Sequence, residues 1–210
     1  PEPGVLRILF LYKNVLQREE IQLENLTRAK KPQRLPVVMD QQEVNAVISH
    51  LQGPAKLAVA LMYGGGLRLL ESLRLRIMDI EFTRSQILVR NGKGAKDRVT
   101  LLPEPLVPAI RKQMEEVRRV HAKDLSNGLG EVYLPHALAK KYTSAPREYG
   151  WQYLFPSSRI STDPRSGQRR RHHLNEGTVQ KNVKNAVRAA GIHKKASCHT
   201  FRHSFATHLL

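Results

Sequence analysis

Residues 199–210, HTFRHSFATHLL, have the spacing of an amphipathic helix. His199, Arg202 and His203 share one face of this helix. An arginine offers a planar fork that matches phosphate oxygens, and a nearby histidine can donate a hydrogen bond or move a proton. Taken alone, each also fits a solvated arginine or a satisfied core histidine. The apolar residues share another face, which we expect in the core: Phe201, Phe205 and Leu209.

The chain carries a large excess of positive charge. Its 210 residues include 35 Lys and Arg against 18 Asp and Glu, a formal net charge of +17. Residues 136–210 alone hold 14 Lys and Arg against 3 Asp and Glu. Concentrated positive charge favours a polyanionic partner, most simply nucleic acid, over a solvated basic surface without a specific partner.

Cysteine content and hydropathy weigh against a disulfide-bonded, a zinc-binding or a membrane-spanning protein. Cys198 is the single cysteine, so no disulfide can form within the chain and a reducing compartment fits. It lies near His199 and His203, but tetrahedral zinc sites usually take paired ligands from two places, so we expect no metal. No apolar run has the length of a membrane span, and we expect no membrane partner.

Two units are predicted along the chain. Residues 5–26 have apolar residues at helical spacing and predict one helix, which cannot fold alone. We therefore assign 1–26 to the remnant of a helical domain. Residues 27–36, TRAKKPQRLP, are basic and twice broken by proline, which is typical of a linker.

Residues 37–210 predict a mainly α domain with a small antiparallel β-hairpin, an α+β fold. Asp40 and Glu43 form a capping-box pattern at the start of a helix. SQILVR (85–90) and RVTLLP (98–103) are β-type runs joined by NGKGAKD, which predicts a hairpin with a glycine-rich loop. Further helices are expected over 54–63, 103–123 and 175–190, with the last helix starting near His199. Residues 125–174 mix glycine, proline and aromatic residues and give no clear pattern.

Other candidate residues lie near glycines. Residues 64–66 and the 91–97 loop both lack the phosphate-loop pattern, so turn formation explains their glycines. Lys93, between two glycines at the hairpin tip, is free to reach a ligand, although most lysines are simply solvated. Arg68 and Glu71 lie three residues apart, which fits either an exposed ion pair or an arginine held in one orientation by a carboxylate.

Together these segments resemble the catalytic domain of the tyrosine recombinases. The resemblance rests on GLRLLESL with Arg68 and Glu71, a hairpin with Lys93, and an H-x-x-R helix with His199 and Arg202, in that order. It implies that Arg68, Lys93, His199 and Arg202 are catalytic, with Glu71 and His203 supporting them. It covers about residues 36–210, and residues 1–26 resemble the last helix of the family's core-binding domain.

The resemblance also implies a mechanism without a cofactor. A tyrosine attacks a DNA phosphate, forms a 3′-phosphotyrosine and releases a 5′-hydroxyl. The hydroxyl of a second strand then attacks the phosphotyrosine linkage. In this family that tyrosine follows the H-x-x-R arginine. Every tyrosine of this chain precedes His199, so we expect a partial sequence that binds DNA but lacks the nucleophile, while the full-length protein is the enzyme. The tyrosines are Tyr12, Tyr63, Tyr133, Tyr142, Tyr149 and Tyr153.

The segment at about 125–174 resembles the extra segment of integron integrases, which recombine gene cassettes at sites folded from one DNA strand. This resemblance implies contacts with extrahelical bases in those folded hairpins. Aromatic and imidazole rings there are expected to stack on a base: Trp151, Tyr153, His172 and His173. Basic residues are expected to hold phosphates: Lys140, Lys141, Arg169, Arg170 and Arg171. The alternative for Trp151 and Tyr153 is packing of the segment onto the domain.

The implied partners are DNA, as cassette hairpin sites and the integron attachment site, and other copies of the chain in a homotetrameric synaptic complex. The implied location is the bacterial cytoplasm, at the nucleoid when bound to DNA. Three alternatives stay open: a phage-type or chromosome-resolving recombinase on duplex sites, a non-catalytic DNA-binding remnant, and a generic basic nucleic-acid-binding module. The long extra segment weighs against the first, and the last leaves the four catalytic matches unexplained.

Overall fold

The computed structural model describes residues 10–17, 35–90, 96–164 and 166–209, and the chain divides into two compact units, Pro1–Leu35 and Pro36–Leu210. The described part of the first unit is one π-helical turn, Leu11–Val15, with exposed apolar side chains. The helix expected over 5–26 is interrupted after this turn, where Gln17 adopts a φ of 51°. A short helix is only marginally stable when no apolar face is packed against the rest of the protein. The other positions of 5–26, and most of the linker, lie outside the described residues.

The second unit is mainly helical with small antiparallel sheets, which confirms the expected fold class. One sheet has the order β1-β2-β3, with β1 at Ile80–Glu81, β2 at Gln86–Val89 and β3 at Arg98–Leu101; β4 (Pro156–Thr162) pairs with β5 (Arg169–His173). The α-helices are α2 (Gln41–Ser49), α3 (Gly53–Gly64), α4 (Leu69–Leu73), α5 (Val107–Ser126), α6 (His136–Lys141), α7 (Glu176–Ala189) and α8 (Cys198–His208). Single 3₁₀ turns are η2 (Ile77–Asp79), η3 (Glu104–Leu106), η4 (Ala145–Arg147) and η5 (Tyr149–Trp151). In the described ranges no helix combines the length and apolarity needed to cross a membrane.

Local capping sets the helix starts as the sequence predicts. Asp40 Oδ1 accepts from the Glu43 backbone N–H at 2.8 Å, and Glu43 Oε2 accepts from the Asp40 N–H at 2.9 Å. Asn175 Oδ1 caps α7 by accepting from the Gly177 N–H at 2.8 Å. These bonds satisfy amide groups that the first helical turn leaves without a partner.

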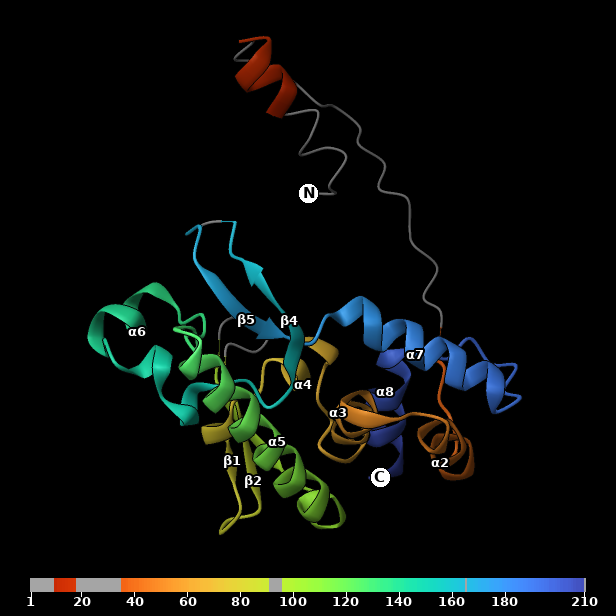
Figure 1. Ribbon diagram of the computed structural model, residues 1–210. Coiled ribbons are helices and arrows are strands. Elements are labelled where there is room, and N and C mark those ends of the chain that lie inside the picture. The colour runs from red at the N-terminus through yellow and green to blue at the C-terminus, as the bar shows by residue number, and fades with distance from the viewer. Residues whose placement is uncertain (1–9, 18–34, 91–95, 165, 210) are drawn as a thin grey trace. The chain divides into compact units, whose positions relative to one another are not determined.

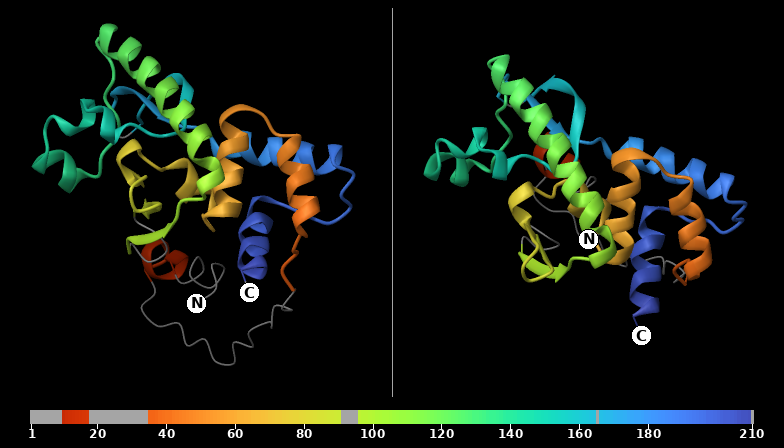
Figure 2. Two further views of the ribbon diagram at one scale, coloured as in Figure 1. Left: turned by 90° about the horizontal axis from the view of Figure 1, so that it is seen from below. Right: turned by 60° about the horizontal axis from the view of Figure 1, so that its bottom comes forward.

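Helix α3 lies at the centre of the main core. Figure 1 shows α2, α7 and α8 gathered around it, with α5, α6, β1 and β2 on the opposite side. Ala58, Val59 and Leu61 on α3 have no exposed surface, and neither does Phe201 on α8. The two views of Figure 2 keep α8 beside α3. Packing against α3 therefore fixes which face of α8 points away from the core.

The apolar face of α8 is buried only over part of its length. Phe201 is fully buried as expected, but Phe205 is half-buried and Leu209 is 67% exposed. The expectation that all three lie in the core is wrong for Leu209. The ring of Phe205 packs over Gly66, at the turn that follows α3, and Leu209 lies one helical turn further on.

The segment at 125–174 has a small core of its own. Its buried residues include Val132, Leu134 and Tyr153, with Trp151 packed against them. Arg76, just before η2, joins this core to the main domain: its Nη2 donates to the Tyr133 carbonyl at 2.8 Å. The Arg76 guanidinium also lies 4.8 Å from the centre of the Tyr153 ring. The segment is thus packed onto the domain rather than attached as a loose loop.

Candidate phosphate-binding site

Arg68 and Glu71 form a tight pair at the start of α4. Arg68 precedes the helix, and its backbone N–H and Nη1 donate to the two oxygens of the Glu71 carboxylate at 2.9 and 2.6 Å. The Glu71 side chain is only 8% exposed, whereas that of Arg68 is 36% exposed. Of the two readings of this pair, the geometry matches an arginine held in one orientation by a carboxylate.

Two further arginines approach the same carboxylate from distant parts of the chain. Arg98, the first residue of β3, donates from Nη2 to Glu71 Oε2 at 2.7 Å. Arg202 on α8 places its Nη1 3.8 Å from that oxygen. Burial raises the pKa of the Glu71 carboxyl, but the hydrogen bonds from Arg68 and Arg98 outweigh it and the pKa is lowered. Glu71 is therefore a carboxylate at neutral pH.

The turn between α3 and α4 brings Arg202 into this site. Arg202 Nη1 donates to the carbonyl oxygen of Gly66, and Thr100 on β3 donates to the carbonyl of Gly65 at 2.8 Å. Gly66 has a φ of 61°, and a Cβ there would collide with the ring of Phe205. Only glycine allows this close approach without strain, so turn geometry accounts for Gly66 as the sequence suggested.

Arg202 is held in a strongly basic environment. Burial lowers the pKa of its guanidinium, and repulsion from Arg68 lowers it further. The three guanidinium groups share one carboxylate, which leaves an excess of positive charge beside a pocket lined by Gly66, Arg98 and Arg202, among others. Guanidinium forks with unused donors bind the oxygens of a phosphate group well.

Two of the histidines of α8, His199 and His203, line different pockets. His203 is exposed and lines the same pocket as Arg202. His199, also exposed, lines a second pocket together with Lys184 and Lys195. The structure thus places His199 and Arg202 in different pockets, although the sequence predicts them on one face of the helix. Lys93 lies outside the described residues.

The sequence predicted Arg68, Glu71 and Arg202 in this site but missed Arg98. The available signal was strand alternation: Arg98 and Thr100 lie two residues apart on the predicted strand and so on the same side of it. Nothing local indicated that this side faces the turn after α3. Among the described residues, no group of three or more His, Cys, Asp or Glu is placed to hold a metal ion.

Three described tyrosines are partly or fully buried and packed within the domain: Tyr63, Tyr149 and Tyr153. Burial raises the pKa of Tyr63, Tyr149 and Tyr153. Tyr63 bonds His208 Nδ1 at 2.9 Å, and Tyr149 donates to the Met114 carbonyl at 2.7 Å. The Tyr63 and Tyr149 hydroxyls are therefore engaged in hydrogen bonds within the domain.

The rings expected to stack on a base lie in different environments. Tyr153 is only 6% exposed and is covered by Arg76 and by the edge of the His173 ring, so it packs the segment onto the domain. This burial does not fit the expected base contact. Trp151 is half-buried, with Arg76 and Arg90 each 5.7 Å from its ring. His172 and His173 are half-buried, and burial lowers the pKa of His173.

The basic residues of the segment are likewise divided between exposed and buried positions. Lys140, Lys141 and Arg169 are exposed, as phosphate contacts require. Arg170 is 9% exposed and pairs with Asp163, 3.8 Å away. Its burial does not fit the expected phosphate contact.

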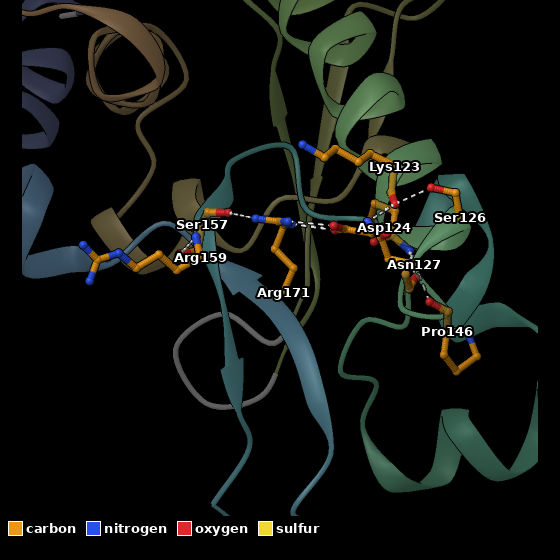
Figure 3. A network of polar contacts seen from close by, with 10 residues as sticks. Lys123, Asp124, Ser126, Asn127, Pro146, Ser157, Arg159 and Arg171 are labelled. Carbon is orange, nitrogen blue, oxygen red and sulfur yellow. Dashed lines mark hydrogen bonds and ion pairs between the residues drawn. The ribbon is translucent and has the colours of Figure 1, made fainter.

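Arg171 anchors the β4–β5 hairpin to α5 (Figure 3). Its Nε and Nη2 donate to both oxygens of Asp124 at 2.6 and 2.7 Å, and its Nη1 donates to the Ser157 carbonyl at 2.6 Å. The Arg171 and Asp124 side chains are 17% and 9% exposed. Ser126 and Asn127 donate to the Lys123 carbonyl beside this pair and close the end of α5. Arg171 therefore stabilises the hairpin instead of facing solvent as expected for a phosphate contact.

We expect Asp124→Ala to lower the free energy of unfolding by about 3 kcal/mol, because it leaves the Arg171 guanidinium buried without its counter-ion. Denaturant unfolding of the purified chain measures this change. Glu115→Ala on the same helix is the matched control, since Glu115 and Arg118 are 3.8 Å apart and more than 60% exposed. That substitution should have little effect. Equal changes in both variants would contradict the anchoring role of Arg171.

Comparison with known proteins places this geometry in context. The model of the phage integrase family matches residues 37–210. A protein named integrase/recombinase from Escherichia coli is 44% identical over 203 residues, which cover 97% of this chain and 60% of that protein. Tyrosine recombinase XerA from Pyrococcus furiosus is 32% identical over 190 residues, covering 89% of this chain and 52% of that protein.

Solved structures show the same fold. The crystal structure of XerA recombinase matches with a TM-score of 0.55 and 25% identity, over 98% of this chain and 60% of that one. XerH recombinase bound to its difH substrate in a pre-cleavage complex matches with a TM-score of 0.58 and 18% identity, over 98% and 52%. The chain thus spans between half and two thirds of the length of these relatives.

Proposed function

This chain belongs to the phage integrase family, and we propose that it is the catalytic domain of a site-specific recombinase that cleaves and rejoins DNA through a phosphotyrosine. The observation that carries the proposal is the convergence of Arg68 and Arg202 beside the Glu71 carboxylate. Arg68 lies just before α4 and Arg202 lies on α8, and with Arg98 they leave an excess of positive charge around one carboxylate. A phosphodiester group of DNA is the anion that best matches such a site.

In the proposed reaction of the whole protein, a tyrosine hydroxyl loses its proton as its oxygen bonds to a DNA phosphorus, and the bond to the 5′-oxygen breaks. The phosphate stays on the 3′ end of the cut strand, and the departing 5′-oxygen takes a proton. A 5′-hydroxyl of a second strand then loses its proton and attacks the phosphotyrosine. This restores the phosphodiester, and the departing tyrosine oxygen takes up a proton. One phosphate ester replaces another at each step, so the reaction needs no cofactor to supply energy.

Each candidate residue has a role in this reaction. Arg68 and Arg202 bind the non-bridging phosphate oxygens, where charge develops in the transition state. His199, exposed at the start of α8, adds a hydrogen bond to these oxygens. Lys93 protonates the 5′-oxygen as general acid. This role is assigned because Lys93 matches the hairpin lysine of the tyrosine recombinases in the order of the sequence motifs. Glu71 orients Arg68, and His203 lines the pocket beside Arg202.

We further propose that the whole protein is an integron integrase that acts on folded single-strand cassette sites as a homotetramer in the bacterial cytoplasm, at the nucleoid. The support is the packed segment at 125–174. Trp151 and His172 are only half-buried, so part of each ring can meet an extruded base. Lys140, Lys141 and Arg169 are exposed and suit phosphate contacts. Tyr153, Arg170 and Arg171 are left out of this surface, because they are paired or packed inside the domain.

A recombinase that acts on duplex sites is the second candidate. The observation that favours it is the similarity to proteins named tyrosine recombinase XerA, at 32% identity over 190 residues. Such an enzyme needs no contact with extruded bases, and the segment at 125–174 would then only add nonspecific phosphate contacts.

Binding of the chain to three DNAs over a salt series separates the two candidates. The DNAs are a single-strand hairpin with extrahelical bases, the same hairpin without them, and the fully paired duplex. We expect the bulged hairpin to bind at least about tenfold more tightly at moderate salt, because base stacking contributes about 1–3 kcal/mol per base. If all three bind alike and weaken together as salt rises, only phosphate contacts act and the integron proposal fails.

Substitutions at Trp151 sharpen this test. Trp151→Ala should remove most of the preference for the bulged hairpin, whereas Trp151→Phe, which retains a stacking ring, should keep much of it. Far-ultraviolet circular dichroism and thermal unfolding show whether the segment stays folded in both variants. An unchanged preference in a folded Trp151→Ala variant would assign Trp151 to packing alone.

A further inference from the structure

Strand β3 enters the arginine site through two side chains on the same side of the strand. Arg98 donates to Glu71 Oε2 at 2.7 Å, and Thr100 donates to the Gly65 carbonyl at 2.8 Å. Both side chains line the pocket that also contains Arg202. The strand is therefore tied both to α4 and to the turn that precedes it.

The acceptor capacity of Glu71 is largely taken up by this arrangement. Oε1 accepts from Arg68 Nη1 at 2.6 Å, while Oε2 accepts from the Arg68 backbone N–H at 2.9 Å and from Arg98. A carboxylate oxygen offers about two acceptor positions, so Oε2 is filled. Arg202 Nη1 stays 3.8 Å from this oxygen, beyond hydrogen-bond distance, and donates to the Gly66 carbonyl instead.

We propose that Arg98 is a positioning residue that keeps Arg202 available for the phosphate by occupying Glu71 Oε2. Without Arg98, the oxygen that it leaves is the nearest unfilled acceptor for the Arg202 guanidinium. Arg202 then moves the short remaining distance into a direct ion pair, and fewer of its donors face the pocket. The inference rests on the proposed function, because it names what controls one phosphate-binding arginine of that site.

The first test measures covalent complex formation and DNA affinity separately, in the whole protein under single-turnover conditions. We expect Arg98→Gln to slow covalent complex formation by about 10- to 100-fold, while DNA affinity changes by less than about threefold. If Arg98 only positions Arg202, the slope of log affinity against log salt should stay unchanged, because the substitution then removes no phosphate contact. Arg98→Lys, which retains the charge without the fork, should recover part of the rate.

Arg90→Gln is the matched control. Arg90 follows β2, in the same hairpin as Arg98, and its Nε lies 2.6 Å from Asp79 Oδ1. The Arg90 side chain is 30% exposed and that of Arg98 is 34% exposed. Asp79 accepts hydrogen bonds from Arg76 and Arg90, away from the Glu71 carboxylate, so this variant should lose stability but keep the rate. Equal slowing in the two variants would show a general effect of the hairpin and would overturn the inference.

A double-substitution cycle with Glu71→Gln tests the route of the effect. If Arg98 acts through Glu71, adding Arg98→Gln to Glu71→Gln should slow the reaction little further. If the two effects instead multiply, and the salt slope falls by about one, Arg98 contacts phosphate directly and the positioning role is wrong.

Binding of inorganic phosphate to the chain compares the Arg98→Gln and Arg90→Gln variants in an assay that does not require DNA cleavage. The probe is the side-chain NMR signal of Arg202 during phosphate titration. Arg98→Gln should weaken the response severalfold more than Arg90→Gln does, and this difference should vanish in the Glu71→Gln background. Failure of the unsubstituted whole protein to form a covalent complex would reject the proposed function. An unaltered phosphate response in Arg98→Gln would reject the role of Arg98.

Discussion

If the whole protein has the proposed activity, replacing Arg202 with alanine is expected to slow covalent complex formation by about 100- to 1,000-fold. Removing one preorganised donor to a developing oxyanion has an effect of about that size. Arg202 is held by the Gly66 carbonyl and lies beside the Glu71 carboxylate, so its fork is already oriented when DNA arrives. DNA affinity should fall only severalfold, since most phosphate contacts lie elsewhere. Quench-flow assays on a labelled hairpin, with gel separation of the protein–DNA adduct, measure both effects.

Two variants control for charge and for folding. Arg202→Lys retains a cation but lacks the planar fork, and we expect it to recover only a small part of the rate. Arg119→Ala removes an arginine whose side chain is 75% exposed on α5, and the rate should not change. A rate for Arg202→Ala within about threefold of the unsubstituted protein would remove Arg202 from the catalytic site, since a lost oxyanion donor has a much larger effect.

Replacing Phe201 with alanine is expected to lower the free energy of unfolding by about 3–5 kcal/mol. The Phe201 ring has no exposed surface and lies among the largest fully buried side chains of the core. Its loss leaves a cavity between α8 and the helix beside it, because the surrounding side chains relax only in part. A loss of this size is a large fraction of the stability of a typical domain. Guanidinium unfolding followed by circular dichroism measures the change in midpoint and slope.

Phe201→Leu is the companion variant and should lose less than half as much stability, because it fills most of the same volume. The two variants should also differ in phosphate binding at Arg202, which lies next to Phe201 on α8 and depends on its docking. If Phe201→Ala costs less than about 1 kcal/mol, α8 is not held by its buried face as described.

Much of the local structure could be predicted from short stretches of sequence. The helix starts at Asp40 and Asn175 follow from side chains that cap backbone amides two or three residues away. The pairing of Arg68 with Glu71 follows from a spacing of three on one short helix. These interactions join neighbours in the chain, so their geometry is set by the helical turn itself.

The environment of the segment at 125–174 could not be predicted in this way. Tyrosine and arginine are residue types that often contact nucleic acid. Yet Tyr153 packs against Arg76, and Arg171 bonds to Asp124. Both partners lie far away in the sequence, on elements whose position depends on the whole domain. Composition therefore suggested the kind of partner, and packing decides which of these side chains remain exposed to it.

By itself, the sequence determined the mainly helical fold class, the helix caps, the positive charge and the Arg68–Glu71 pair, because these depend on composition or on contacts within a few residues. Only the tertiary structure decided that Arg98 and Arg202 meet at Glu71, and that His199 lines a neighbouring pocket. Docking α8 on α3 and β3 against the turn after α3 brings together residues that lie far apart in the chain. For α8 that meeting follows from burying its apolar face against α3. For β3 it follows from the hydrogen bonds of Arg98 and Thr100, and no local spacing encodes either contact.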